Sequence, residues 1–162
     1  MPGNPSTVRR VAAGLALIIA PTLFLLADII SPAWSDDTAQ HVQQVDENPG
    51  RQGVYGLLSV LGFTLLVPGI IGIVHLIRGP GMTLAHIGGG LAVIGFGAGP
   101  ALAGSGVTDA VAVDTIGPEA YTVLLEGLQE NAAWILLVLL IAIPSLLSVI
   151  LMAMAVWRSG FA

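Results

Sequence analysis

Four long stretches of the chain are almost free of charged side chains, and polar segments separate them. They run over residues 11–30, 54–77, 82–103 and 132–157, and Asp28 is the one aspartate, glutamate, lysine or arginine within them. A helix that crosses the hydrocarbon core of a bilayer needs about 20 mostly apolar residues. Because lipid offers the backbone no hydrogen-bond partners, such runs must pair their amide groups internally, as a helix does. The pattern predicts an all-α, polytopic membrane protein with four transmembrane helices.

The connections predict how these spans pair. Residues 78–81 read Arg-Gly-Pro-Gly, a tight turn that makes the second and third spans antiparallel neighbours. The other two connections, 31–53 and 104–131, are long loops on the opposite side of the membrane. We therefore expect a single transmembrane domain over residues 1–162, a bundle made of two antiparallel hairpins.

The two long loops differ in pattern. Residues 36–52 show no helical period of apolar positions, so we expect them to be irregular. In the second loop, residues 117–119 read Gly-Pro-Glu, a typical helix start, and apolar residues then recur at helical spacing from Tyr121 to Leu128. This predicts a short helix that either lies at the membrane interface before the fourth span or extends that span.

The arginines predict the orientation. Arg9, Arg10, Arg78 and Arg158 fall on one side of the predicted spans, and Arg51 alone falls on the other. Basic residues near the ends of spans are retained in the cytoplasm. We therefore expect a multi-pass protein of the cell membrane with both termini cytoplasmic. The first apolar run exceeds the roughly 7–15 residues of a signal peptide, which favours a retained anchor over a cleaved signal.

The composition of the chain excludes several kinds of functional site. The chain is 55% hydrophobic and 9% charged, with a mean hydropathy of +0.90, whereas soluble domains carry about 25% charged residues. It has no cysteine and no lysine, which excludes disulfides, thiolate metal sites and lysine Schiff bases. No nucleotide-binding loop or hydrolase motif is present, and no basic patch supports nucleic-acid binding. The lipid bilayer is the first partner that this composition predicts.

Each predicted span contains a proline, which removes one helix hydrogen bond and bends a helix. These candidate kinks are Pro21, Pro68, Pro100 and Pro144. Transporters build sites in broken helices, but prolines are also common in ordinary membrane helices. Residues 68–74 and 144–150 share one pattern of proline, small residue, two aliphatics, small residue and two aliphatics. Either a duplicated hairpin or the small alphabet of apolar spans explains it.

The third span carries small residues along one helix face. They recur at steps of three or four residues: Gly88, Ala92, Gly95, Gly99 and Ala103. Such a face lets another helix approach closely. It predicts either packing within this bundle, which we favour, or a contact with another membrane subunit or a second copy of the chain.

Two histidines and one candidate ion pair complete the polar features of the spans. His75 ends the second span and His86 begins the third, so both lie near the tight turn and are candidates to hold a haem iron. Asp28 and Arg51 fall at neighbouring span ends and are a candidate ion pair. No set of residues with a metal-ligand spacing accompanies the histidines, so we expect neither a metal nor another cofactor in the favoured interpretation.

Three functional hypotheses follow. We favour a non-enzymatic accessory or interaction subunit, because the small-residue face suits helix association and the spans hold no deep charge or catalytic set. A small-solute transporter or channel that uses the proline-bearing helices is the first alternative. A haem-binding redox protein that uses His75 and His86 is the second.

Overall fold

The computed structural model describes residues 5–160, all of its regular structure being helical. The helices are α1 (Pro5–Ile30), α2 (Thr38–Glu47), α3 (Pro49–Leu76), α4 (Met82–Ala103), α5 (Ser105–Ile116), α6 (Pro118–Glu130) and α7 (Ala132–Arg158), with a short 3-10 turn η1 (Gly79–Gly81) between α3 and α4. Four long helices are apolar enough to cross a membrane, which confirms the predicted helical membrane class. The two chain ends, predicted to be cytoplasmic, lie outside the described residues.

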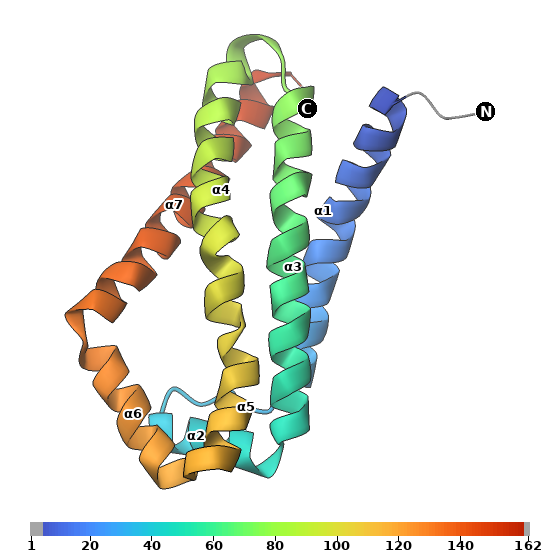
Figure 1. Cartoon of the computed structure of the whole chain (residues 1–162). Coiled ribbons are helices and arrows are strands. Elements are labelled where there is room, and N and C mark those ends of the chain that lie inside the picture. Colours follow the sequence, from blue (N-terminus) through green and yellow to red (C-terminus); the bar gives the residue numbers. More distant parts are fainter. Residues whose placement is uncertain (1–4, 161–162) are drawn as a thin grey trace.

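The long helices lie in a row in the order α1, α3, α4 and α7 (Figure 1). Each packs along the next, and α3 runs antiparallel to α4 through the turn η1. Within residues 5–160, α1 contacts neither α4 nor α7. The two end helices of the row therefore each have a single long neighbour, and both broad faces of the row are open.

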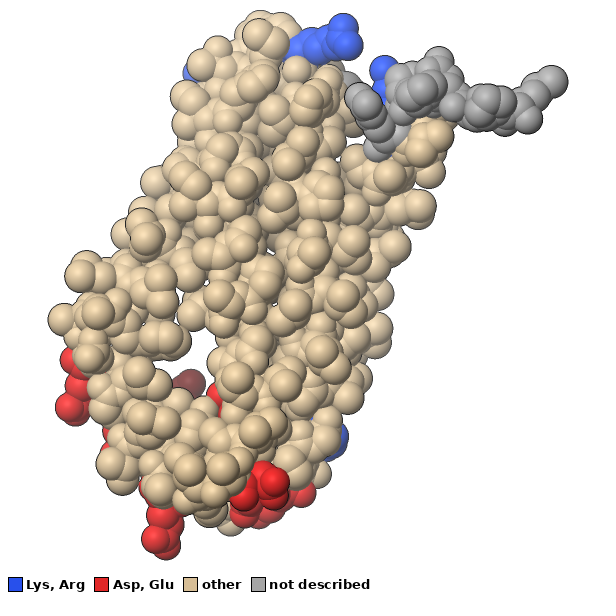
Figure 2. All heavy atoms as spheres, viewed as in Figure 1, with Lys and Arg blue, Asp and Glu red and all other residues tan. Residues whose placement is uncertain are grey.

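Charge is divided between the two ends of this row. On the face shown in Figure 2, acidic side chains gather at one end and basic side chains mainly at the other, with uncharged residues between them. We call the end formed by α2, α5 and α6 the acidic end, and the end formed by η1 and the last turn of α7 the arginine end. Arg78 and Arg158 lie at the arginine end, whereas Arg51 begins α3 at the acidic end.

The lengths of the helices place α5 beyond the apolar body. The 22 residues of α4 extend about 33 Å at 1.5 Å per residue. That length already matches the hydrocarbon core of about 30 Å. Because α5 follows α4 after Gly104 alone, it carries the chain past this thickness. Together with α2 and α6 it forms a small helical cap on the acidic end (Figure 1).

Small residues allow the long helices to pack closely. Gly62 and Gly69 of α3 lie against Phe24 and Leu17 of α1, where a Cβ atom would come within about 3 Å of either side chain. Between α4 and α7, a Cβ atom at Gly95 of α4 would strike Ser145 of α7. Glycine at these positions therefore allows close approach of neighbouring helices.

Residues 36–52 were predicted to be irregular, but most of them lie in α2 and in the first turn of α3. Asp37 caps α2, since its carboxylate accepts a hydrogen bond of 2.9 Å from the backbone N–H of Gln40. Val42 and Val45 are buried in the cap with Val113 of α5 and Tyr121 of α6. Only two apolar positions of α2 are buried, too few to mark a helical period in the sequence.

The segment 104–131, predicted to be a loop with one helix, contains two helices. Between them Gly117 has a φ of 84°, a backbone conformation that favours glycine and reverses the chain. Asn131 then separates α6 from α7 with an extended ψ of 121°, and its side chain caps α7 by accepting from the N–H of Ala133. The predicted helix after Pro118 is therefore a distinct element, not an extension of the fourth span.

Candidate functional site

Two glycines bring α3 and α5 into direct backbone contact at the acidic end. A Cβ atom on Gly56 would lie 2.8 Å from the backbone N of Val107, and one on Gly106 would lie 2.9 Å from the Cα of Gly56. Any side chain at this crossing would force the helices apart. Their contact brings Gln52, one turn before Gly56, beside Asp109, three residues after Gly106.

A buried chain of hydrogen bonds joins three helices near this crossing. The Gln52 side-chain N–H donates to one carboxylate oxygen of Asp109 at 3.3 Å, and the Tyr121 hydroxyl donates to the other at 2.5 Å. The exposed fractions of Gln52, Asp109 and Tyr121 are 2%, 8% and 5%. The side-chain oxygen of Gln52 is buried and has no hydrogen-bond partner among the residues that the structure describes. The cap is thus fastened to α3 through polar groups shielded from water.

Within residues 5–160, the donors that hydrogen-bond to the carboxylate of Asp109 are the uncharged side chains of Gln52 and Tyr121. Arg51, the one arginine at the acidic end, donates instead to the backbone carbonyl of Ile30 at 3.0 Å. Burial, followed by the hydrogen bond to Asp109 and the charge of that carboxylate, raises the pKa of Tyr121 above its ordinary value. The phenol therefore stays protonated and keeps donating to the carboxylate well beyond neutral pH.

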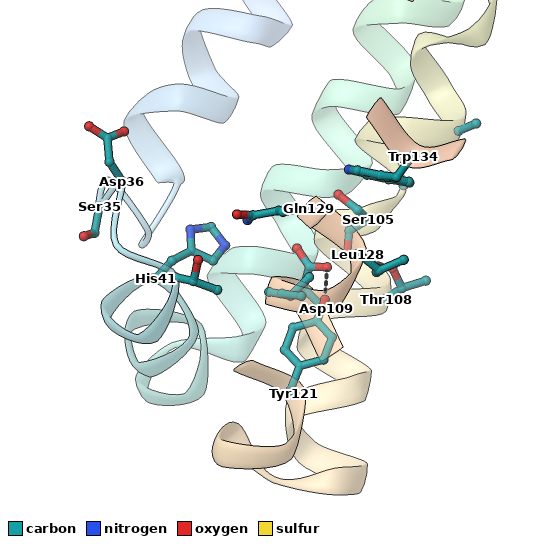
Figure 3. Close-up of a pocket in the computed structure, with 14 residues that line it drawn as sticks. Ser35, Asp36, His41, Ser105, Thr108, Asp109, Tyr121, Leu128, Gln129 and Trp134 are labelled. Carbon is teal, nitrogen blue, oxygen red and sulfur yellow. Dashed lines mark hydrogen bonds between the residues drawn. The ribbon is translucent and has the colours of Figure 1, made fainter. Parts of the chain in front are cut away.

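A pocket of about 590 Å³ opens beside this buried chain (Figure 3). Its walls come from the segment before α2, from α2 itself, from the end of α4, from α5 and α6, and from the start of α7. The lining residues are Ser35, Asp36, Thr38, His41, Ala101, Gly104, Ser105, Thr108, Asp109, Tyr121, Leu125, Leu128, Gln129 and Trp134. Figure 2 shows the molecule hollowed near its acidic end, with acidic side chains visible inside the opening.

The labelled side chains divide into an interior and a rim. In Figure 3 the ring of His41 points from α2 toward Asp109, while Asp36 points away from the other labelled residues. Trp134, at the start of α7, is half-buried and closes the side of the pocket opposite α2. The interior thus combines one buried carboxylate with aromatic and hydroxyl groups.

The predicted haem ligands lie away from this pocket, near the arginine end. His75 is exposed on α3 and His86 is exposed on α4. Each Nδ1 lies within hydrogen-bond distance of the carbonyl four residues earlier in its own helix, at 2.7 Å from Ile71 and 2.8 Å from Met82. Among residues 5–160 no three metal-ligating side chains converge. Haem binding by this pair stays a prediction.

The predicted pairing of Asp28 with Arg51 is not what the structure contains. Asp28 is exposed on α1, and the Arg51 guanidinium bonds to the carbonyl of Ile30 at the end of the same helix. The last carbonyls of a helix have no partner within it and attract cationic donors. Arg51 therefore joins the ends of α1 and α3 through the backbone and not through the carboxylate.

The predicted small-residue face of α4 packs within the chain. Gly88 lies against Leu151 and Met152 of α7, Gly95 against Ser145 of the same helix, and Gly99 against Phe63 of α3. Ala92 is buried between them and Ala103 is half-buried. The four predicted prolines lie inside α1, α3, α4 and α7.

Sequence reasoning missed Gln52 and Asp109 as site residues and assigned Tyr121 only to a helix face. A usable signal existed for Asp109, which is the one charged residue of the stretch 106–113, where Thr108 is the one other polar side chain. An acid in such a setting is buried and needs donors.

No protein-family model, curated protein or solved structure matches the chain.

Proposed function

We propose that this protein is a non-enzymatic accessory subunit of the cell membrane, which associates with another membrane helix through an exposed face of α4. The observation that carries the proposal is a second line of small residues on that helix, distinct from the one used inside the chain. Its small members are the exposed residues Gly90, Gly97 and Ala101, and two larger exposed residues, His86 and Ile94, follow the same spacing of three or four positions.

This exposed face has room for a partner. A Cβ atom placed on Gly90 or on Gly97 would meet nothing within 4 Å, in contrast to one on Gly88, Gly95 or Gly99. In lipid, helices associate by close van der Waals packing and weak hydrogen bonds, which glycine and alanine permit. A helix with small residues on two faces can therefore pack within its own chain and against a partner at once.

The open row of helices keeps this face accessible. In the proposed topology α1 with α3 and α4 with α7 form two hairpins, joined where α3 meets α4. Because α1 does not reach α4 or α7, no helix of the described chain closes over α4. The arrangement suits a protein that is completed by another membrane subunit or by a second copy of itself.

The test is extraction from native membranes in a mild detergent, followed by native mass spectrometry of wild type and variants. We expect wild type to carry a stoichiometric partner or a second copy, and Gly90→Leu and Gly97→Leu to lose it. Gly14→Leu is the matched control, because Gly14 also lies within a long helix and its Cβ position meets nothing within 4 Å.

Two outcomes would contradict the proposal. One is a wild-type protein that remains a partner-free monomer in detergent and after crosslinking in native membranes. The other is a complex that survives Gly90→Leu and Gly97→Leu as well as it survives Gly14→Leu.

Solute transport is the second candidate, and the pocket at the acidic end favours it. Ala101 and Gly104, which line the pocket, come one and four residues after Pro100 of α4. A proline-bearing helix can bend beside a binding site. Counterflow of a broad solute panel in proteoliposomes tests this function, with Pro100→Ala as the variant beside the pocket and Pro68→Ala and Pro144→Ala as variants of the other proline-bearing helices. Wild-type flux equal to that of empty vesicles would refute it.

A further inference from the structure

The pocket at the acidic end has a chemistry that selects a particular class of ligand. Its volume of about 590 Å³ lies within the roughly 300–1,000 Å³ of small-molecule sites. Asp109 is the buried charged group in its wall, and Tyr121 and Trp134 supply aromatic surface. We propose that this pocket binds a small organic cation, an amine or quaternary ammonium compound, with Asp109 as the anionic anchor.

The first argument is the charge of Asp109. A buried carboxylate costs free energy unless it is paired or well hydrogen-bonded. Here two uncharged donors, Gln52 and Tyr121, each supply one hydrogen bond, and Arg51, the arginine at the acidic end, is engaged elsewhere. A cationic ligand in the pocket would complete this compensation.

The second argument is the negative electrostatic field around the pocket. Nine acidic residues lie at the acidic end, against Arg51 alone: Asp36, Asp37, Asp46, Glu47, Asp109, Asp114, Glu119, Glu126 and Glu130. Charges of one sign around a hollow with low-dielectric walls concentrate counter-ions inside it. The pocket therefore attracts cations and repels anionic solutes.

The third argument separates an organic cation from a metal ion. Among the described residues no three acidic or histidine side chains converge as metal ligands, and Asp36 points away from Asp109 (Figure 3). The remaining walls present tyrosine, tryptophan and leucine side chains together with His41, Gln129 and several hydroxyl groups. Aromatic faces next to a carboxylate favour alkylammonium groups, through cation–π attraction and apolar contact.

The test is isothermal titration of the full-length protein in detergent or nanodiscs with choline and benzyltrimethylammonium. The uncharged analogue of choline, in which carbon replaces the quaternary nitrogen, has the same shape without the charge. We expect saturable binding of the cations and at least about tenfold weaker binding of the analogue, since an ion pair in a shielded site contributes that much. A second readout is the fluorescence of Trp134 in a variant carrying Trp34→Phe and Trp157→Phe.

Variants locate the site. Asp109→Asn should weaken choline binding about tenfold or more, whereas Asp114→Asn removes the same charge from an exposed position of α5 outside the pocket and should have little effect. Thr108→Phe is a second variant that keeps Asp109 and its donors. Thr108 is exposed on the pocket wall, so the bulky ring should block binding without unfolding the cap.

Several results would overturn the proposal. They are the absence of saturable binding by both cations, equal binding of the uncharged analogue, and equal effects of Asp109→Asn and Asp114→Asn. Calcium that displaces choline and binds more tightly would also reject an organic cation as the ligand. None of these outcomes depends on the membrane partner proposed for α4, so the two proposals stand or fall separately.

Discussion

At the scale of single residues, the hydroxyl of Tyr121 makes a buried hydrogen bond within the cap. It donates to the carboxylate of Asp109, whose exposed fraction is 8%. Hydrogen bonds to charged groups contribute about 1.5–3 kcal/mol, and an orphaned buried acceptor adds its desolvation cost. We expect Tyr121→Phe to lower the free energy of unfolding by roughly that amount, measured by denaturation in detergent micelles.

Tyr55→Phe is the matched control for this substitution. Tyr55 is half-buried on α3 and is the one other tyrosine of the chain. A loss of stability in Tyr55→Phe equal to that in Tyr121→Phe would show that the hydrogen bond from Tyr121 to Asp109 does not account for the loss.

The raised pKa of Tyr121 predicts how the free energy of unfolding depends on pH. The pKa of Tyr121 is raised in the folded protein by burial and by Asp109, so the folded state holds this proton more tightly than the unfolded state. Its contribution is complete below the unfolded pKa of about 10 and falls by about 1.4 kcal/mol per pH unit above it. Denaturation at rising pH should show this loss in wild type and not in Tyr121→Phe.

A direct titration checks the same assignment. Tyr55→Phe leaves Tyr121 as the one tyrosine of the chain, and its phenolate absorbance should appear only when alkali or denaturant unfolds the cap. Ionisation of the folded protein near pH 10, the value of free tyrosine, would contradict the burial of Tyr121.

At the scale of helices, the packing of α4 against α7 depends on the absence of a side chain at Gly95. A Cβ atom there would strike Ser145 and lie 3.0 Å from the backbone carbonyl of Ile141, which has little freedom to move. We expect Gly95→Ala to lower stability by roughly 1–3 kcal/mol, the usual cost of overpacking. Thermal unfolding in detergent measures it. Gly14→Ala, which meets nothing within 4 Å, should be neutral or stabilising, and equal effects of the two would refute this account.

The helix α2 depends on its capping residue. Asp37 accepts from the N–H of Gln40 and begins the only helix that lies between α1 and α3. Loss of such a cap costs about 1 kcal/mol, so Asp37→Ala should speed hydrogen exchange in Thr38–Glu47. Asp36→Ala removes the same charge one residue earlier and should leave exchange unchanged. Slow exchange in both variants would show that tertiary packing alone holds α2.

At the scale of the molecule, the sequence predicted the helical membrane class because long apolar runs have one structural solution in lipid. The cap was not predicted, since its contacts join residues far apart in the chain. Gln52 and Asp109 are 57 positions apart, and no local period marks such a pair.

For α2 a local signal did exist: Asp37 followed by Gln40 is the spacing of a capping box. The bond from Arg51 to the carbonyl of Ile30 could not be predicted from side-chain types, because its acceptor is an unpaired backbone group at a helix end.

The separation of charge between the two ends predicts how the whole molecule lies in the membrane. Arg10, Arg78 and Arg158 share the arginine end, and positively charged residues are retained in the cytoplasm. The cap and its pocket should therefore face outward. Because the chain has no cysteine, Thr108→Cys and Thr83→Cys each create a single reactive thiol at an exposed position. In intact cells a membrane-impermeant maleimide should label Thr108→Cys, and it should label Thr83→Cys only after permeabilisation. The reverse pattern would place the pocket in the cytoplasm, where it would meet a different set of cations.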